Sequence, residues 1–196
     1  MRQKIRNTTY FLRALVMSPG STGAIAPSSR WLARQIVEQV PIERARVVVE
    51  FGPGTGSFTG VIAERIHPDA CFFAVELNSE LARFVNRRFP SVTVYNDSVA
   101  NISELCEREG VDGVDCVISS LPWANFPDEL QETILDAMIE MMTPGGIFTT
   151  FAYLHGLNLP GGKAFRERLE ARFSKVELTE PVWLNIPPAL CYRCEL

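Results

Sequence analysis

The chain has 196 residues, of which 46% are hydrophobic and 21% are charged, a balance typical of one globular domain and not of a disordered, fibrous or disulfide-stapled chain. Six basic residues and no acidic residue precede Glu38, whereas the other 13 basic residues share the rest of the chain with 23 acidic ones. A basic N-terminal segment followed by an acidic remainder indicates that one part of the protein contacts an anionic surface. It disfavours binding to a long nucleic acid, because proteins that bind long nucleic acids usually distribute basic residues over much of their surface.

Residues 2–16 have the pattern of an amphipathic helix, with arginines beside a single apolar arc. A turn at residues 18–21 ends this pattern, so we predict an N-terminal helix and linker over residues 1–20 and one domain over 21–196. Such a helix either lies in the head-group plane of an anionic membrane or packs on the domain. Arg13 interrupts the apolar stretch after Tyr10, so no secretory signal is predicted.

Helices and strands alternate regularly over the rest of the chain. A helix that begins at Ser28 or Ser29 is expected to place Trp31, Leu32, Ile36 and Val40 on its apolar face. We then predict strands at 46–51, 71–76, 92–95, 115–119, 147–153, 175–179 and 190–195, and helices at 57–66, 79–89, 101–108, 128–142 and 163–173.

This alternation predicts an α/β fold, a Rossmann-like sheet of seven strands that is mostly parallel. The last two strands have no helix between them, so we expect an antiparallel hairpin at one edge. Ligands of such sheets bind beyond the carboxyl ends of the strands. The residues at those ends are therefore the candidate site.

The five cysteines are interpreted as reduced thiols, most of them in the core. Cys191 and Cys194 form a lone C-x-x-C motif, and the chain has only two histidines. These are too few ligands for a structural zinc site, so no metal is predicted.

The first strand ends in a glycine-rich turn, Glu50-Phe51-Gly52-Pro53-Gly54-Thr55-Gly56. Glycines allow a ligand to approach the backbone closely, and the helix that follows offers free N–H groups. Ser57 stands where a dinucleotide-binding fingerprint has its third glycine, which disfavours a nicotinamide cofactor. We take Glu50, Gly52, Gly54 and Gly56 as candidate cofactor-binding residues; the alternative is a plain tight turn.

Acidic residues follow the next two strands. Glu76 comes 24 residues after Gly52, where a carboxylate can accept hydrogen bonds from both hydroxyls of a ribose. Asp97 can accept from an adenine amino group, and we include the neighbours Leu77 and Ser98 in the same binding site. Glu76 could instead be a solvated strand end, and Asp97 an Asx-turn or helix cap.

The fourth strand ends in Ser120-Leu121-Pro122-Trp123. Proline makes this turn rigid, and an indole beside it can offer its face to an amine or a cation. We predict these four residues as the catalytic turn; the alternative for Trp123 is an ordinary loop residue. Beyond the fifth strand, Tyr153, His155 and Lys163 are weaker candidates for contact with a substrate phosphate.

Taken in order, E-x-G-x-G-x-G, Glu76, Asp97 and S-L-P-W resemble the class I methyltransferases that act on nitrogen. Residues 23–29 (G-A-I-A-P-S-S) and 121–127 (L-P-W-A-N-F-P) are similar to segments of bacterial phospholipid N-methyltransferases. The sister family, the rRNA adenine dimethyltransferases, typically has N-L-P-Y and a C-terminal helical domain. This chain has Ser120 and Trp123 instead, and no such domain is predicted after its last strand.

The resemblance implies S-adenosyl-L-methionine as methyl donor and phosphatidylethanolamine, methylated toward phosphatidylcholine, as acceptor. It implies a cytoplasmic enzyme on the inner face of the cell membrane, with anionic lipid as partner. Ser120 and the Leu121 carbonyl would orient the amine, and Trp123 would face the cationic centre. Three alternatives stay open: an adenine N6-methyltransferase of rRNA, a methyltransferase of a small soluble amine, and a binding protein that has kept the fold without catalysis.

Overall fold

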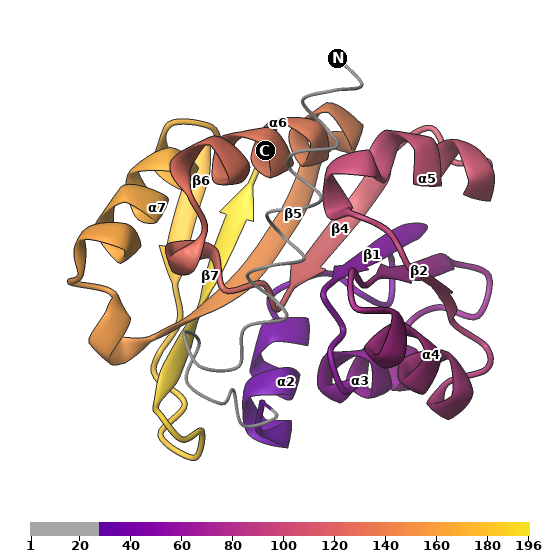
Figure 1. Cartoon of the computed structure of the whole chain (residues 1–196), viewed down its shortest axis with the longest axis horizontal. Helices are drawn as coiled ribbons and strands as arrows, with labels where there is room; N and C mark the ends of the chain where they lie inside the picture. The colour runs from indigo at the N-terminus through magenta and orange to yellow at the C-terminus, as the bar shows by residue number, and fades with distance from the viewer. Residues whose placement is uncertain (1–27) are drawn as a thin grey trace.

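Seven strands form one sheet in the computed structural model, which describes residues 28–196 (Figure 1). The N-terminal helix and the boundary at residue 20 that we predicted lie outside this range. The strand order is β3-β2-β1-β4-β5-β7-β6; β1 to β5 are parallel, and β7 runs antiparallel to both of its neighbours. The strands are β1 (Val47–Phe51), β2 (Cys71–Val75), β3 (Thr93–Tyr95), β4 (Val114–Ser119), β5 (Met142–Tyr153), β6 (Lys175–Leu178) and β7 (Ala189–Glu195).

Helices cover both faces of the sheet. They are α2 (Arg30–Val37), α3 (Ser57–Arg65), α4 (Ser79–Arg88), α5 (Ile102–Glu109), α6 (Asp128–Met141) and α7 (Pro160–Glu170), with 3-10 turns η1 (Val99–Asn101), η2 (Trp123–Asn125) and η3 (Leu154–Gly156). The predicted Rossmann-like fold and its antiparallel hairpin are confirmed. Ser29 caps α2 as predicted, since its side chain accepts a hydrogen bond from the Leu32 N–H. Trp31 is an exception, because 56% of it is exposed and it does not join the apolar face.

Two hydrophobic clusters separate on the two faces of the sheet. Along β1, Val48 packs with α2 and α3, and Val49 packs with α5 and α6, because successive side chains of a strand point to opposite faces. Cys191 and Cys194 are three residues apart on β7, and they belong to opposite clusters. Their thiols therefore cannot bind one metal ion together.

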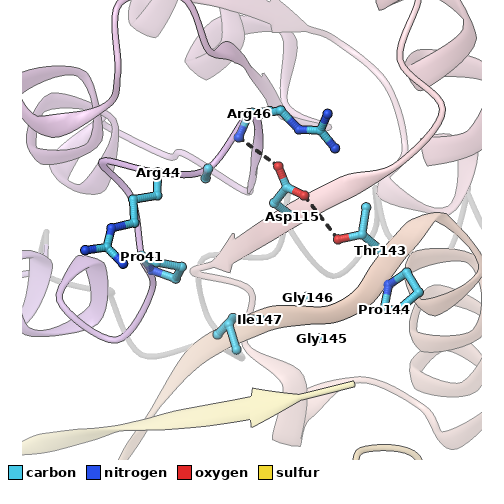
Figure 2. Close-up of a pocket in the computed structure, with 10 residues that line it drawn as sticks. Pro41, Arg44, Arg46, Asp115, Thr143, Pro144, Gly145, Gly146 and Ile147 are labelled. Atoms are coloured by element: carbon cyan, nitrogen blue, oxygen red, sulfur yellow. Dashed lines mark hydrogen bonds between the residues drawn. The ribbon is translucent and has the colours of Figure 1, made fainter.

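The carboxyl ends of the parallel strands meet at one edge of the sheet. Phe51 pairs with Val75 and with Ser119, and the end of β5 pairs with the start of β7. The opposite edge carries a cavity of about 300 Å³ between the starts of β1, β4 and β5 (Figure 2).

One carboxylate, that of Asp115, links the strands around this cavity. Its Oδ2 accepts from the Arg46 N–H at 2.7 Å, and its Oδ1 accepts from the Thr143 hydroxyl at 3.1 Å (Figure 2). Asp115 thus holds the amino-terminal starts of three strands together. This cavity lies away from every candidate site residue, so we assign it a structural role.

Candidate active site

The glycine loop between β1 and α3 has three glycines with positive φ, and their surroundings differ. A Cβ at Gly52 would lie 2.8 Å from the Leu121 side chain, and one at Gly56 would lie 2.6 Å from the ring of Phe89. At Gly54 the nearest atom would be the Gly52 carbonyl oxygen, 3.9 Å away. Gly52 and Gly56 thus make room for the chain's own side chains, whereas Gly54 leaves space free above the loop.

Glu50, the fourth residue of β1, is fully buried directly before this loop. Its Oε2 accepts a hydrogen bond from the Thr59 hydroxyl at 2.7 Å, and its Oε1 has no partner among residues 28–196. Burial raises the pKa of the Glu50 carboxyl to about 8. A buried acceptor without a donor fits a ligand that brings an N–H group or an ammonium.

Glu76 follows β2 and is 5% exposed. Its Oε2 accepts from the Gly54 N–H at 3.0 Å, and its Oε1 accepts from the Asn78 N–H at 2.9 Å. Burial also raises the pKa of the Glu76 carboxyl. The Asn96 amide donates to the carbonyls of Glu76 and Leu77, at 2.9 Å each, and fixes this turn. The carboxylate therefore lies beside the open position at Gly54, which suits the hydroxyls of a ribose.

Asp97 and Ser98 make local hydrogen bonds after β3. The Asp97 Oδ1 accepts from the Ser98 N–H at 2.7 Å and from the Asn101 amide at 2.8 Å, while the Ser98 hydroxyl caps η1. The Asp97 bonds close no Asx-turn, which would use the N–H two residues on, and the cap is made by Ser98 instead of Asp97. The role of both residues in donor binding stays a prediction.

The turn after β4 is tied to the glycine loop. The Ser120 hydroxyl donates to the Gly52 carbonyl, and the Ser120 N–H donates to the Phe51 carbonyl at 2.9 Å. The Leu121 carbonyl accepts from the Trp123 N–H at 2.9 Å, and the Leu121 side chain lies over Gly52. The structure therefore brings the predicted catalytic turn and the predicted cofactor loop into direct contact.

Trp123 does not present an open face to an acceptor. It is 2% exposed, its ring stacks on Phe165 at 5.2 Å, and its Nε1 donates to the Ser119 hydroxyl at 3.0 Å. Gly161 lets the start of α7 approach the backbone of Ala124 closely, and this approach brings Phe165 over the indole. Our prediction that the indole faces the amine is wrong for this structure, in which Trp123 packs in the core.

The weaker candidates lie beyond the end of β5. Tyr153 is half-buried and stacks on the exposed His155, with ring centroids 5.7 Å apart. Burial raises the pKa of the Tyr153 hydroxyl. Lys163 is exposed in the first turn of α7. The structure thus pairs Tyr153 with His155 and places Lys163 on the next segment, and their phosphate contact stays a prediction.

Gln131, for which we predicted no role, supports the predicted catalytic turn from α6. Gln131 is 1% exposed, and its amide donates to the carbonyls of Trp123 at 2.9 Å and Phe126 at 3.0 Å. One signal was present: Gln131 lies four residues before Leu135 and seven before Met138, on the buried face of the predicted helix. A polar residue at such a position needs buried partners.

A Rossmann-like sheet, an open glycine loop beside a buried acid, and a fourth-strand turn tied to that loop together define the class I methyltransferases. Residues 48–146 match the family described as methyltransferase domain. The chain belongs to this family.

The chain is 34% identical to an ornithine lipid N-methyltransferase from Singulisphaera acidiphila over 174 residues, which are 87% of this chain and 86% of the relative. It is 32% identical to a ribosomal RNA small subunit methyltransferase A from Prosthecochloris aestuarii, but over 46% of this chain and 33% of that protein. The O-methyltransferase TomG from Streptomyces achromogenes, crystallised with SAM, shares the fold: its TM-score is 0.65 at 16% identity, over 97% of this chain and 88% of TomG. The protein is thus an S-adenosylmethionine-dependent methyltransferase, as predicted.

Proposed function

We propose that this enzyme methylates the primary amine of a membrane-lipid head group, either phosphatidylethanolamine or an amine-bearing lipid such as ornithine lipid. The observation that carries the proposal is the similarity to an ornithine lipid N-methyltransferase over 87% of the chain. The turn that resembles those of amine methyltransferases lies against the glycine loop, as transfer between two bound substrates requires.

The residues present fit the proposed donor. Gly54 leaves room for close approach, Glu76 offers carboxylate oxygens to a ribose, and Glu50 has a free buried acceptor for an amino group. Asp97 would accept from the adenine. When bound, S-adenosylmethionine would supply an electrophilic methyl group: the amine lone pair would form the new N–C bond as the C–S bond breaks, and S-adenosylhomocysteine would leave.

The acceptor amine must be neutral before it attacks. A primary amine has a pKa of about 10.4 in water, and desolvation at the sheet edge favours its neutral form. The Ser120 hydroxyl already donates to Gly52, so its oxygen is left to accept from the amine and to direct the nitrogen lone pair. The Leu121 carbonyl is the second acceptor at this turn.

The distribution of charge along the chain supports a lipid, and not a nucleic acid, as the methyl acceptor. The part from Glu38 onward carries a net charge of −10, while the preceding segment is purely basic. We propose that the basic segment lies on anionic lipid and that the enzyme binds the inner, cytoplasmic face of the cell membrane. None of the helices in residues 28–196 is long and apolar enough to cross a membrane.

The acceptor can be identified by where the methyl label goes. Purified full-length chain with labelled S-adenosylmethionine is offered phosphatidylethanolamine vesicles, ornithine lipid vesicles, rRNA and free ethanolamine in separate reactions. Label in a lipid extract supports the proposal, and label in RNA or in free ethanolamine alone overturns it. Ser120→Ala should slow transfer to lipid more than it weakens binding of S-adenosylhomocysteine. The substitution removes the acceptor contact and one hydrogen bond to the Gly52 carbonyl, but the N–H of residue 120 still ties the turn to the Phe51 carbonyl.

A further inference from the structure

Three large apolar side chains are exposed on residues 181–188, the greater part of the connection between β6 and β7, and we call this segment the apolar loop. Trp183, Leu184 and Ile186 are 69%, 65% and 85% exposed. Residues 181–188 include no charged residue, and Glu180 directly precedes them. A cluster of this kind differs from the single apolar residues scattered over ordinary surfaces, and it indicates an interaction surface.

The apolar loop is fastened at its centre and its base. Asn185 is 3% exposed; its Oδ1 accepts from the Ser29 N–H at 2.9 Å, and its Nδ2 donates to the Pro187 carbonyl at 2.7 Å. The Val182 N–H donates to the Ala189 carbonyl at 2.7 Å. The buried amide therefore holds the loop against the start of α2, while the flanking apolar side chains stay exposed.

The apolar loop projects from the same edge of the sheet as the active site. Because β7 is antiparallel to β5 and Tyr153 pairs with Ala189, the start of β7 lies at the carboxyl end of β5. In Figure 1 the yellow loop before β7 lies beside the start of α2. Three strand spacings separate β7 from β1, which is about 14 Å across this edge.

The neighbouring face of α2 adds an aromatic ring and a cation. The Gln35 amide donates to the Thr179 hydroxyl and to the Glu180 carbonyl, at 2.6 Å each, so this face of α2 borders the apolar loop. Trp31 precedes Gln35 by four residues and therefore lies on the same face, 56% exposed. The Arg34 guanidinium lies 6.0 Å from the centre of the Trp31 ring. Tryptophan and aliphatic residues beside arginine match the boundary between lipid acyl chains and anionic head groups.

We propose that the apolar loop inserts Trp183, Leu184 and Ile186 into the interface of a lipid bilayer and so holds the active-site edge against the head groups. The inference rests on the proposed function, because a lipid amine stays in the head-group layer and the edge that binds it must reach that layer. A second copy of this chain is the competing occupant of the loop.

Tryptophan fluorescence of the full-length chain provides a local test. Vesicles of phosphatidylethanolamine and phosphatidylglycerol with brominated acyl chains should quench part of the emission, and Trp183→Phe should remove most of that quenching while vesicle affinity stays within about twofold. Leu184→Ser with Ile186→Ser should weaken vesicle binding tenfold or more. Phe84→Ser, at an exposed apolar residue of α4, is the matched control and should leave binding unchanged.

The inference is overturned if Trp183→Phe leaves the quenching undiminished, or if the double variant binds vesicles like the wild type. A small residual quenching is expected from Trp31, which is 56% exposed beside the loop. The inference is also overturned if the double variant changes the oligomeric state in sedimentation velocity without lipid and leaves vesicle binding intact, which would show a second copy as occupant. Methyl transfer to lipid dissolved in detergent micelles needs no bilayer, so it separates this inference from the proposed function. The apolar-loop variants should methylate micellar lipid as fast as the wild type does. If the wild type itself does not methylate micellar lipid, the proposed lipid acceptor is wrong, and the inference about the loop is judged by vesicle binding.

Discussion

At the scale of single residues, Gly54 and Gly110 form a matched pair. Both have positive φ, +57° and +70°, and neither has an atom closer than 3.9 Å to the position of an added Cβ. Alanine at either position should cost about 1 kcal/mol of stability through backbone strain. Only Gly54→Ala should also weaken the binding of S-adenosylhomocysteine, by tenfold or more in calorimetry, because its methyl group fills the ligand space. Equal affinities in the two variants would remove Gly54 from the donor site.

Glu50 makes the stability of the ligand-free enzyme depend on pH. Burial raises the pKa of this carboxyl from 4.5 to about 8, so the folded protein holds a proton that the unfolded chain has released. The contribution of Glu50 to stability is therefore present below pH 4.5 and is lost as the pH rises toward 8. The largest slope for one proton is about 1.4 kcal/mol per pH unit.

Urea unfolding at a series of pH values tests this assignment. Between pH 5 and 8, the wild type should lose stability relative to Glu50→Gln, which cannot titrate. Parallel curves for the two proteins would mean that the Glu50 carboxyl has an ordinary pKa and is solvated.

The predictions for Trp31 and Trp123 were wrong, and they show which properties of a residue the local sequence cannot predict. Sequence patterns correctly placed the glycine loop after β1 and the two acids after β2 and β3, because these positions depend on local sequence at the end of one strand. They could not show that Phe165 stacks on Trp123 or that Trp31 stays exposed, since both depend on which distant elements pack there. Gln131 was missed for the same reason, because its partners lie in another element.

At the scale of elements, the predicted catalytic turn is held in place by α6 and α7. The indole of Trp123 packs on α7 through Phe165, and Gln131 of α6 holds the backbone of η2. Trp123→Ala should therefore destabilise the protein by about 3–5 kcal/mol in urea unfolding, as removal of a buried aromatic ring does. The fraction that remains folded should bind S-adenosylhomocysteine with nearly wild-type affinity. If Trp123→Ala instead leaves the stability unchanged and slows methyl transfer, Trp123 contacts the acceptor and is not a packing residue.

The boundaries of most elements followed from the sequence to within a few residues, and β5 is the main departure. It begins at Met142, not at residue 147, because Met142 already pairs with Val114 before the register shifts. The segment Pro144-Gly145-Gly146 has the composition of a turn. In the structure this segment is an irregularity within β5, between the pairs Val114–Met142 and Cys116–Ile147, and the Leu196 N–H donates to the Gly146 carbonyl at 3.1 Å. These partners are distant in sequence, so local composition could not predict them.

At the scale of the whole molecule, two different forces are proposed to hold the enzyme on a membrane. The basic segment would act through charge, which salt screens, and the apolar loop through burial, which salt leaves intact. Deletion of residues 1–16 should therefore weaken sedimentation with anionic vesicles and remove most of its salt dependence, while donor binding persists. Equal sedimentation of the truncated and intact chains at low salt would contradict a role for the basic segment.

The central claim is that the methyl group goes to the amine nitrogen of a lipid, and mass spectrometry of the intact product tests it most directly. The enzyme is incubated with S-adenosylmethionine carrying a deuterated methyl group and with vesicles of phosphatidylethanolamine or ornithine lipid. The account predicts a labelled lipid whose fragments carry the deuterated methyl on the head-group nitrogen. Label on an oxygen of the lipid, or unlabelled lipid beside methylated adenine when rRNA is present, would contradict it.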